Sequence, residues 1–488
     1  MALTREPGFT IETIGVPPPA EPTLRGGFAT ILILAALVVR PNADARRADF
    51  ALYLQARSFA ALRLDIPRPP DATVPADVVL RDGLYYADAA PGAPLLLVPF
   101  VWAGWVLDWF TDGRLGSQDT AGWRVPNGEY LAVHSANLLF LAGVLYFLTR
   151  LSLVLMRTRS PATILRASDL LFFTAPLWNE CSHPVTFLPA TMFLLGATAC
   201  VFEARSERAP WLTAGALAAG AVFVRPTDVV LTLLLLAYGI GVARRPTAAA
   251  LRFAAPLSLA VVALIVVNGA MHRASLGGFP SASTDDARAS RFETPLVDGL
   301  VGLTVGAISG PVSEDDEERR AMVIPDASTP WKRVRGLVLV MPVVLFGIAG
   351  LLRLDREDQR AEAAVIGGSF VLLLLLFARS SRWYGDGTTP LASRFLTEAM
   401  PAWCLATAAW SEEIKGWRRS LFMIATCWSA CNQLLVVLSP YVAALSGVDV
   451  TGAHVWKVGS LLLIASIFAW LAEGTRRNYA EGPTPRFP

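Results

Sequence analysis

Apolar runs close to the roughly 20 residues that cross a bilayer recur from about residue 24 to residue 473, separated by polar or proline-bearing breaks. Such runs predict helices, because a backbone surrounded by lipid must satisfy its hydrogen bonds within its own segment. We predict an all-α, polytopic transmembrane bundle of about twelve spans that forms one domain over residues 1–488. The expected spans are residues 24–40, 129–150, 162–178, 184–203, 210–224, 227–243, 251–271, 333–353, 362–378, 394–411, 418–438 and 455–473.

A further apolar run, Pro94–Phe110, is harder to assign because it carries Asp108 and precedes a polar, glycine-bearing stretch. Short cytoplasmic loops collect arginine and lysine. If this run does not cross the membrane, every predicted inner loop is positively charged. If it does cross, either the N-terminal segment or the whole later series of arginines must face outward. We therefore expect a helix lying on the outer face, where Trp102, Trp105 and Trp109 suit the membrane interface.

This assignment makes both termini cytoplasmic and leaves two long outward segments, residues 41–128 with interfacial helices and residues 272–332. The first apolar run has no small-residue cleavage site after it, so we expect it to remain as an uncleaved span. The second outer segment contains the acidic run Ser313–Arg320, which ends in arginines. We interpret that run as solvated surface rather than as a metal site.

Composition excludes several classes of protein. Hydrophobic residues make up 54% of the chain, charged residues make up 17%, and the mean hydropathy is +0.47, which excludes a soluble globule. The 42 basic residues nearly balance the 40 acidic ones without a basic block, so nucleic acid is not an expected partner. The five cysteines lack the spacing of a disulfide framework or a zinc site. No HExxH, phosphate-binding glycine loop or GxSxG motif occurs, which leaves zinc, nucleotide and serine-hydrolase chemistry unsupported.

Two carboxylates, Asp44 and Asp49, follow the first predicted span and are expected at the outer membrane surface. Apolar positions from Asp49 to Leu64 roughly follow a helical repeat, which predicts a helix lying along the interface. Each aspartate is a candidate catalytic base. The alternative for each is a structural role, either in an ion pair with arginine or as a helix cap. Further along, Tyr85 and Tyr86 precede a Pro-Gly-x-Pro turn, which is either part of the site or purely structural.

The segment 378–395, predicted to face outward between two spans, departs from the charge rule because short outer loops normally avoid arginine. Guanidinium groups beside aromatic rings at the bilayer edge suit the binding of an anionic lipid phosphate. Interfacial anchoring is the alternative. The candidates here are Arg379, Arg382, Trp383, Tyr384 and Arg394.

Two other outer turns carry candidate residues. Arg225, in the short turn Arg-Pro-Thr-Asp, departs from the same charge rule and faces either the same site or an ordinary structural environment. The turn Pro176–Pro184 gathers Asn179, Glu180 and His183 at the predicted surface. These are open to roles as acceptor contacts or as local structural residues.

At these residues the chain resembles the bacterial integral-membrane glycosyltransferases of the GT-C fold, the superfamily of protein O-mannosyltransferases and the aminoarabinose transferase. The stretch Asp49–Tyr53 resembles the family's Asp-x-x-x-Tyr signature, with Arg57 and Ser58 near its Arg-Ser pair. Further matches are Asp82–Tyr86 and Pro91–Leu95, which resemble its Tyr-Tyr and Pro-Gly-x-Pro-Leu stretch, and Trp383, Tyr384, Gly385, Arg394 and Phe395, which resemble a later loop. Phe50 stands where the family commonly carries Glu, which leaves open whether a divalent cation assists.

The resemblance implies a glycosyltransferase that moves a hexosyl or pentosyl group from a polyprenyl-phosphate carrier to an acceptor hydroxyl on the periplasmic side of the bacterial cytoplasmic membrane. It implies Asp49 as general base, with Asp44 in reserve, and arginines that stabilise the leaving phosphate. The acceptor, whether glycan, lipid or protein, is left open. The residues expected to bind substrate are Tyr53, Arg57, Tyr85, Tyr86, His183, Arg225, Arg379, Arg382, Trp383, Tyr384 and Arg394.

Two other functions remain as alternatives. A transporter or flippase of a lipid-linked saccharide would carry ionisable residues at mid-membrane and paired halves, whereas the charges here gather mostly at span ends. An O-antigen-ligase-like enzyme would draw its catalytic contacts from one large outer loop, whereas the motifs here divide between residues 41–128 and residues 378–395.

Overall fold

The computed structural model describes most of the chain between residues 21 and 446. The described ranges are 21–37, 48–69, 71–75, 78–81, 83–87, 89–120, 122–155, 161–181, 186–203, 210–243, 245–272, 296–304, 336–356, 359–379 and 396–446. The predicted span 455–473 and Asp44 lie outside them, as does the acidic run Ser313–Arg320.

The described chain is dominated by helices. In the first half these are α1 (Glu21–Leu37), α2 (Ala48–Ala60), α3 (Gly92–Phe110), α4 (Asn127–Leu155), α5 (Pro161–Asp169), the π-helical turn η1 (Leu170–Thr174), α6 (Leu177–Cys181), α7 (Phe187–Phe202), α8 (Trp211–Val224), the 3-10 turn η3 (Pro226–Asp228) and α9 (Val229–Val242). They continue with α10 (Pro246–His272), α12 (Leu296–Thr304), α14 (Leu337–Val340), η6 (Pro342–Leu345), α15 (Phe346–Arg356), α16 (Arg360–Ala378), α17 (Met400–Ser411) and α18 (Trp417–Ser446). Each expected span up to residue 438 overlaps one helix or consecutive helices within the residues that the structure describes.

Four of these helices, α3, α4, α10 and α16, are long and apolar enough to cross a membrane by length and composition, and shorter apolar helices include α7, α8 and the segment Pro226–Val242. The chain is therefore a helical, multi-pass membrane protein. The total of about twelve spans stays a prediction. The run Pro94–Phe110 is helical, as expected, but its length and composition also fit a span, so its placement on the outer face stays a prediction too.

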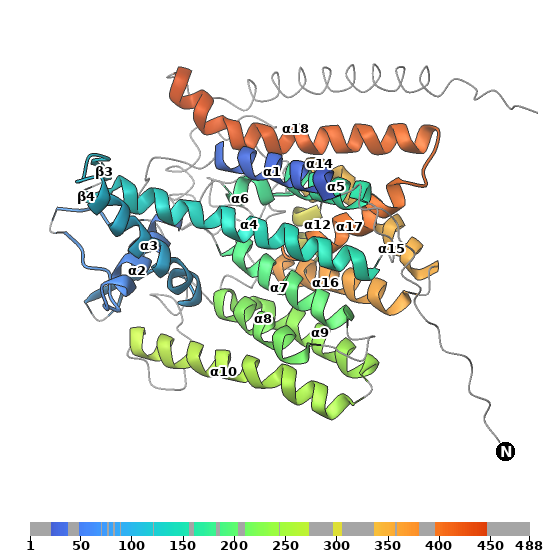
Figure 1. Cartoon of the computed structure of the whole chain (residues 1–488), viewed down its shortest axis with the longest axis horizontal. Helices are drawn as coiled ribbons and strands as arrows, with labels where there is room; N and C mark the ends of the chain where they lie inside the picture. The colour runs from blue at the N-terminus through green and yellow to red at the C-terminus, as the bar shows by residue number, and fades with distance from the viewer. Residues whose placement is uncertain are drawn as a thin grey trace, which may run out of the picture.

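The helices pack side by side in a layered bundle (Figure 1). Helices α4, α7 and α8 pack in succession, α10 lies along one edge against α8, and α18 lies along the opposite edge against η1 and η6. Helices α2 and α3 lie together at one end, beside the start of α4 (Figure 1). Helices from residues 48–128, a range that is predicted to face outward, therefore lie together at one end of the bundle.

Two short antiparallel hairpins accompany α2 and α3, a feature that the helical prediction missed. Strand β1 (Val78–Arg81) pairs with β2 (Leu84–Ala87), and β3 (Ser117–Thr120) pairs with β4 (Trp123–Pro126). The glycines in their turns, Gly83 and Gly122, have φ of +78° and +85°, which a residue with a Cβ rarely adopts. The Asp-Gly pair at 82–83 is a recognised signal for such a tight hairpin.

Candidate functional site

Helix α2 is where the strongest sequence motif lies, and Asp49 is in its first turn. From Phe50 to Ala60 its side chains are buried, except that of Arg57, which is 39% exposed. This differs from the expected interfacial helix, which would bury one face only. The difference arises because α3 and β2 cover α2. The helix that carries Asp49 in its first turn is therefore held from Phe50 onward by packing within the protein.

A buried carboxylate, Glu129, anchors α2 to the start of α4. Tyr53 Oη donates a hydrogen bond to Glu129 Oε1 over 2.9 Å, and Arg57 Nε lies 3.3 Å from the same oxygen. Trp105 Nε1, from α3, donates to Glu129 Oε2 over 3.0 Å. Tyr53 and Arg57 are one helical turn apart and so meet the same partner. These contacts join α2, α3 and α4 at one buried side chain, which the sequence analysis did not single out.

The pKa of Tyr53 is raised well above its usual value. Burial is the largest cause, and the negative charge of Glu129 is the next. The phenol therefore stays protonated and serves as a hydrogen-bond donor to the carboxylate. Sequence reasoning placed Tyr53 and Arg57 in the substrate site. In the structure both bind Glu129, and their contact with substrate stays a prediction. Glu129 was overlooked because it opens an apolar run and carries no motif of its own.

Asp108 has a structural role at the same place. Its two carboxylate oxygens accept hydrogen bonds from the backbone N–H groups of Gly128 and Glu129, each over 3.1 Å. The first N–H groups of a helix have no partner within the helix, so Asp108 caps α4 from the neighbouring α3. A Cβ on Gly128 would lie 2.3 Å from Asp108 Oδ1, so glycine is what allows this approach.

The two candidate tyrosines of β2 have different surroundings. Tyr86 is buried in the core, whereas Tyr85 is half-buried. Arg68 Nη1 donates to Tyr85 Oη over 2.8 Å, and the same guanidinium lies 5.5 Å from the centre of the Tyr85 ring. Gln55 of α2 accepts a hydrogen bond from the backbone N–H of Ala87, over 3.0 Å. The hairpin is thus joined to α2 by the backbone next to these tyrosines.

A small buried apolar cluster joins α2 to the turn that carries Arg225. It consists of Leu52, Ala93, Ala190 and Val224, from α2, α3, α7 and α8. Leu52 follows Asp49 within the same helical turn, and Val224 directly precedes Arg225. The Pro-Gly turn allows this packing, because a Cβ on Gly92 would lie 2.1 Å from the backbone oxygen of Phe223. Three motif segments that are far apart in the sequence therefore meet here.

Arg225 ends α8 in an extended conformation, with φ −141° and ψ 96°, as expected of a residue before proline. Its side chain is only 9% exposed and forms an ion pair with Glu398, which is itself buried. The guanidinium carbon lies 4.1 Å from the ring centre of Phe187 and 5.0 Å from that of Phe377. The charge of Arg225 is thus already matched within the protein.

The remaining candidates are described in part or not at all. Arg379 follows the last residue of α16 and is exposed. His183, Arg382, Trp383, Tyr384 and Arg394 lie outside the described residues, together with Asp44. Within the part of the chain that the structure describes, no group of three or more His, Cys, Asp or Glu side chains is arranged to hold a metal ion.

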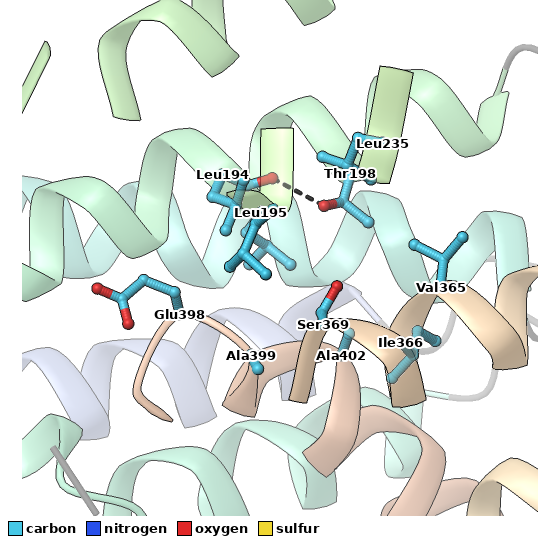
Figure 2. Close-up of a pocket in the computed structure, with 11 residues that line it drawn as sticks. Leu194, Leu195, Thr198, Leu235, Val365, Ile366, Ser369, Glu398, Ala399 and Ala402 are labelled. Carbon is cyan, nitrogen blue, oxygen red and sulfur yellow. Dashed lines mark hydrogen bonds between the residues drawn. The ribbon is translucent and has the colours of Figure 1, made fainter. Parts of the chain in front are cut away.

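A small cavity lies between α7, α9, α16 and the start of α17 (Figure 2). Its volume is about 20 Å³, which is room for about one water molecule. Leucine side chains line much of it, and the carboxylate of Glu398 points away from Ser369 and Ile366 (Figure 2). The cavity is therefore too small for a sugar or a lipid phosphate, and it is not the substrate site.

Comparison with known proteins gives structural likenesses alone: no protein-family model and no curated protein sequence matches the chain. Among solved structures, the chain is similar to ArnT from Cupriavidus metallidurans bound to undecaprenyl phosphate, with 13% identity and a TM-score of 0.45 over 96% of this chain and 82% of that one. It is also similar to the apo oligosaccharyltransferase of Archaeoglobus fulgidus, with 12% identity and a TM-score of 0.43 over 90% of this chain and 55% of that one.

A further likeness is to the oligosaccharyltransferase AglB of Archaeoglobus fulgidus in complex with an inhibitory peptide and a dolichol-phosphate, with 10% identity and a TM-score of 0.42. The chain covers 57% of that protein. At such identities and scores, what these proteins bind or transfer does not pass to this chain. Its function has to be argued from its own residues.

Proposed function

We propose that this protein is a membrane glycosyltransferase that moves a sugar from a polyprenyl-phosphate carrier to an acceptor hydroxyl. The reaction takes place at the end of the bundle that carries α2 and α3. The supporting observation is the apolar cluster of Leu52, Ala93, Ala190 and Val224, which brings the Asp49 motif, the Pro-Gly turn and the Arg225 turn together. The resemblance to GT-C enzymes singled out the first two segments, and the arginine pattern singled out the third. Neither argument used any contact between them.

In the proposed reaction the acceptor oxygen attacks the sugar carbon that is bonded to phosphate. The carbon–oxygen bond to phosphate breaks, and the leaving polyprenyl phosphate keeps the electron pair. Asp49 accepts the proton of the attacking hydroxyl, and Asp44 is the reserve candidate for that role. A single displacement of this kind inverts the configuration at the sugar carbon.

The contacts around α2 support this role for Asp49, because a general base must be held in a defined position relative to the reacting atoms. Glu129 binds Tyr53 and Arg57 one and two turns further along the same helix. Covered on nearly every side, α2 has little freedom to tilt or rotate. The base is thereby positioned by a rigid helix.

Negative charge that develops on the leaving phosphate requires a cation. Arg379 is exposed at the end of α16, and we propose it for this role together with Arg382 and Arg394. Each of these three guanidinium groups can form paired hydrogen bonds to phosphate oxygens. We further propose that this site faces the outer side of the bacterial cytoplasmic membrane and that both termini are cytoplasmic.

The test is a transfer assay with purified protein in lipid nanodiscs. The donors are radiolabelled polyprenyl-phosphate-linked hexoses and pentoses, and the acceptor is a bacterial envelope extract. We expect release of free polyprenyl phosphate together with label in the acceptor. Movement of the intact donor between leaflets of proteoliposomes, without cleavage of the sugar–phosphate bond, would instead identify a flippase and contradict the proposal.

A further inference from the structure

Arg225 connects the two ends of the segment that lies between α16 and α17. Phe377, whose ring lies 5.0 Å from the guanidinium, is in the last turn of α16. Glu398, the ion-pair partner, precedes α17 in a buried turn that also contains Leu396 and Thr397. One side chain therefore contacts the chain just before residues 380–395 and just after them.

The other contacts of Arg225 fix its own position. Phe187, the first residue of α7, covers the guanidinium at 4.1 Å. Val224, immediately before Arg225, packs in the apolar cluster with Leu52 of α2. The end of α16 is also confined from another side, since a Cβ on Gly299 of α12 would lie 1.6 Å from the backbone oxygen of Ala378.

We propose that Arg225 is a positioning residue: it fixes where the segment between α16 and α17 begins and ends relative to α2, rather than binding the lipid phosphate itself. A buried ion pair is costly to desolvate and often adds little net stability. We therefore attribute to the pair of Arg225 and Glu398 mainly the positioning of the segments that carry them. The aromatic side chains of Phe187 and Phe377 lie close to the guanidinium, and Glu398 already pairs with its Nη1. A phosphate oxygen that approached Nη1 would have to displace that carboxylate.

The expected effect on sugar transfer rests on the proposed function, whereas the positioning of the chain by Arg225 does not. Residues 380–395 include Arg382 and Arg394, which are proposed to bind the donor phosphate. Displacement of reacting groups by about 1 Å can lower a rate by about 100-fold. We therefore expect kcat/KM for the donor to fall by about 10- to 100-fold in both Arg225→Lys and Glu398→Gln. The double variant should be no worse than either single variant, because both act through one contact.

The Glu398→Gln variant separates positioning from direct phosphate binding. Positioning predicts that it is as damaging as Arg225→Lys. Direct binding predicts the opposite, because removing the competing carboxylate frees the guanidinium, so donor affinity should stay the same or improve. Unchanged or improved donor affinity in Glu398→Gln would overturn the proposal.

The matched control is Glu203→Gln, which breaks a second Arg–Glu contact at the other end of α7. Arg150 Nε and Nη2 lie 3.0 Å and 2.7 Å from Glu203 Oε1. This variant should lower the melting temperature without changing kcat/KM of the folded protein. We call Arg225→Lys and Glu398→Gln the two clamp variants, because each breaks the ion pair that holds both ends of the segment. If they lower the melting temperature without changing kcat/KM, as this control should, Arg225 is only a stabilising residue and the proposal is wrong.

A second measurement does not depend on enzyme activity. Trypsin cleavage after Arg379, the residue that follows α16, reports how often the end of α16 opens, because proteolysis follows local opening. We expect cleavage there to accelerate by about fivefold or more in Arg225→Lys and Glu398→Gln, and to stay unchanged in Glu203→Gln. An unchanged cleavage rate in both clamp variants would overturn the positioning role. Accelerated cleavage in a protein that transfers no sugar would leave that role standing and refute the proposed function alone.

Discussion

At the scale of single residues, the site is organised by side chains whose partners are distant in sequence. Glu129 binds Tyr53, Arg57 and Trp105, and Arg225 binds Glu398. Spacing along a chain predicts which residues share a helix face, but it does not predict which buried carboxylate they will meet. This is why the sequence singled out Tyr53 and Arg57 but not Glu129, the buried carboxylate that both of them bind.

The first prediction concerns Tyr53. Replacing it with Phe keeps the ring and removes one of the donors to a buried carboxylate. We expect Tyr53→Phe to lower the free energy of unfolding by about 1–3 kcal/mol, measured by denaturant unfolding in detergent, and to leave the donor KM unchanged. Tyr146→Phe is the control, because Tyr146 is 57% exposed on α4. A raised donor KM with unchanged stability would contradict this structural role and indicate that Tyr53 contacts the donor.

At the scale of elements, apolar run length predicted the helices well, because lipid imposes the same requirement on every span. The hairpins β1–β2 and β3–β4 were missed because each strand has only four residues, too few to show an alternating pattern. The burial of α2 was also missed. Its side chains are apolar enough for either lipid or protein, and only the three-dimensional neighbours decide between them.

The second prediction concerns the contact between α3 and α8. A Cβ on Gly92 would lie 2.1 Å from the backbone oxygen of Phe223, so Gly92→Ala must push the two helices apart. Overpacking of this kind costs about 1–3 kcal/mol, which should appear as a lower melting temperature and a reduced transfer rate. Gly241→Ala is the matched control, since nothing lies within 4 Å of the added Cβ. Equal melting temperatures in both variants would show that this helix contact is loose.

At the scale of the whole molecule, Figure 1 shows α2, α3 and the hairpin β3–β4 at one end of the bundle, and the hairpin β1–β2 packs against α2. The arginine pattern predicts that this end faces outward. Among the described cysteines, Cys427 is half-buried and the others are buried, which keeps background labelling low.

The third prediction is that single cysteines introduced by Thr73→Cys and Ser117→Cys both react with a membrane-impermeant maleimide in intact cells. Both positions are exposed and lie on either side of α3 in the sequence. If α3 crosses the membrane, they fall on opposite sides. Labelling of Ser117→Cys only after permeabilisation would therefore contradict the twelve-span arrangement.

The central claim is that Asp49 accepts the proton of the acceptor hydroxyl, and the most direct measurement is the turnover of Asp49→Asn in the transfer assay. Asparagine has nearly the same shape but does not accept a proton at neutral pH, so turnover should fall by about 100-fold or more while donor binding is retained. Asp65→Asn, which affects a carboxylate of the same segment paired with Arg63, should keep full turnover. Full turnover in Asp49→Asn would contradict the account.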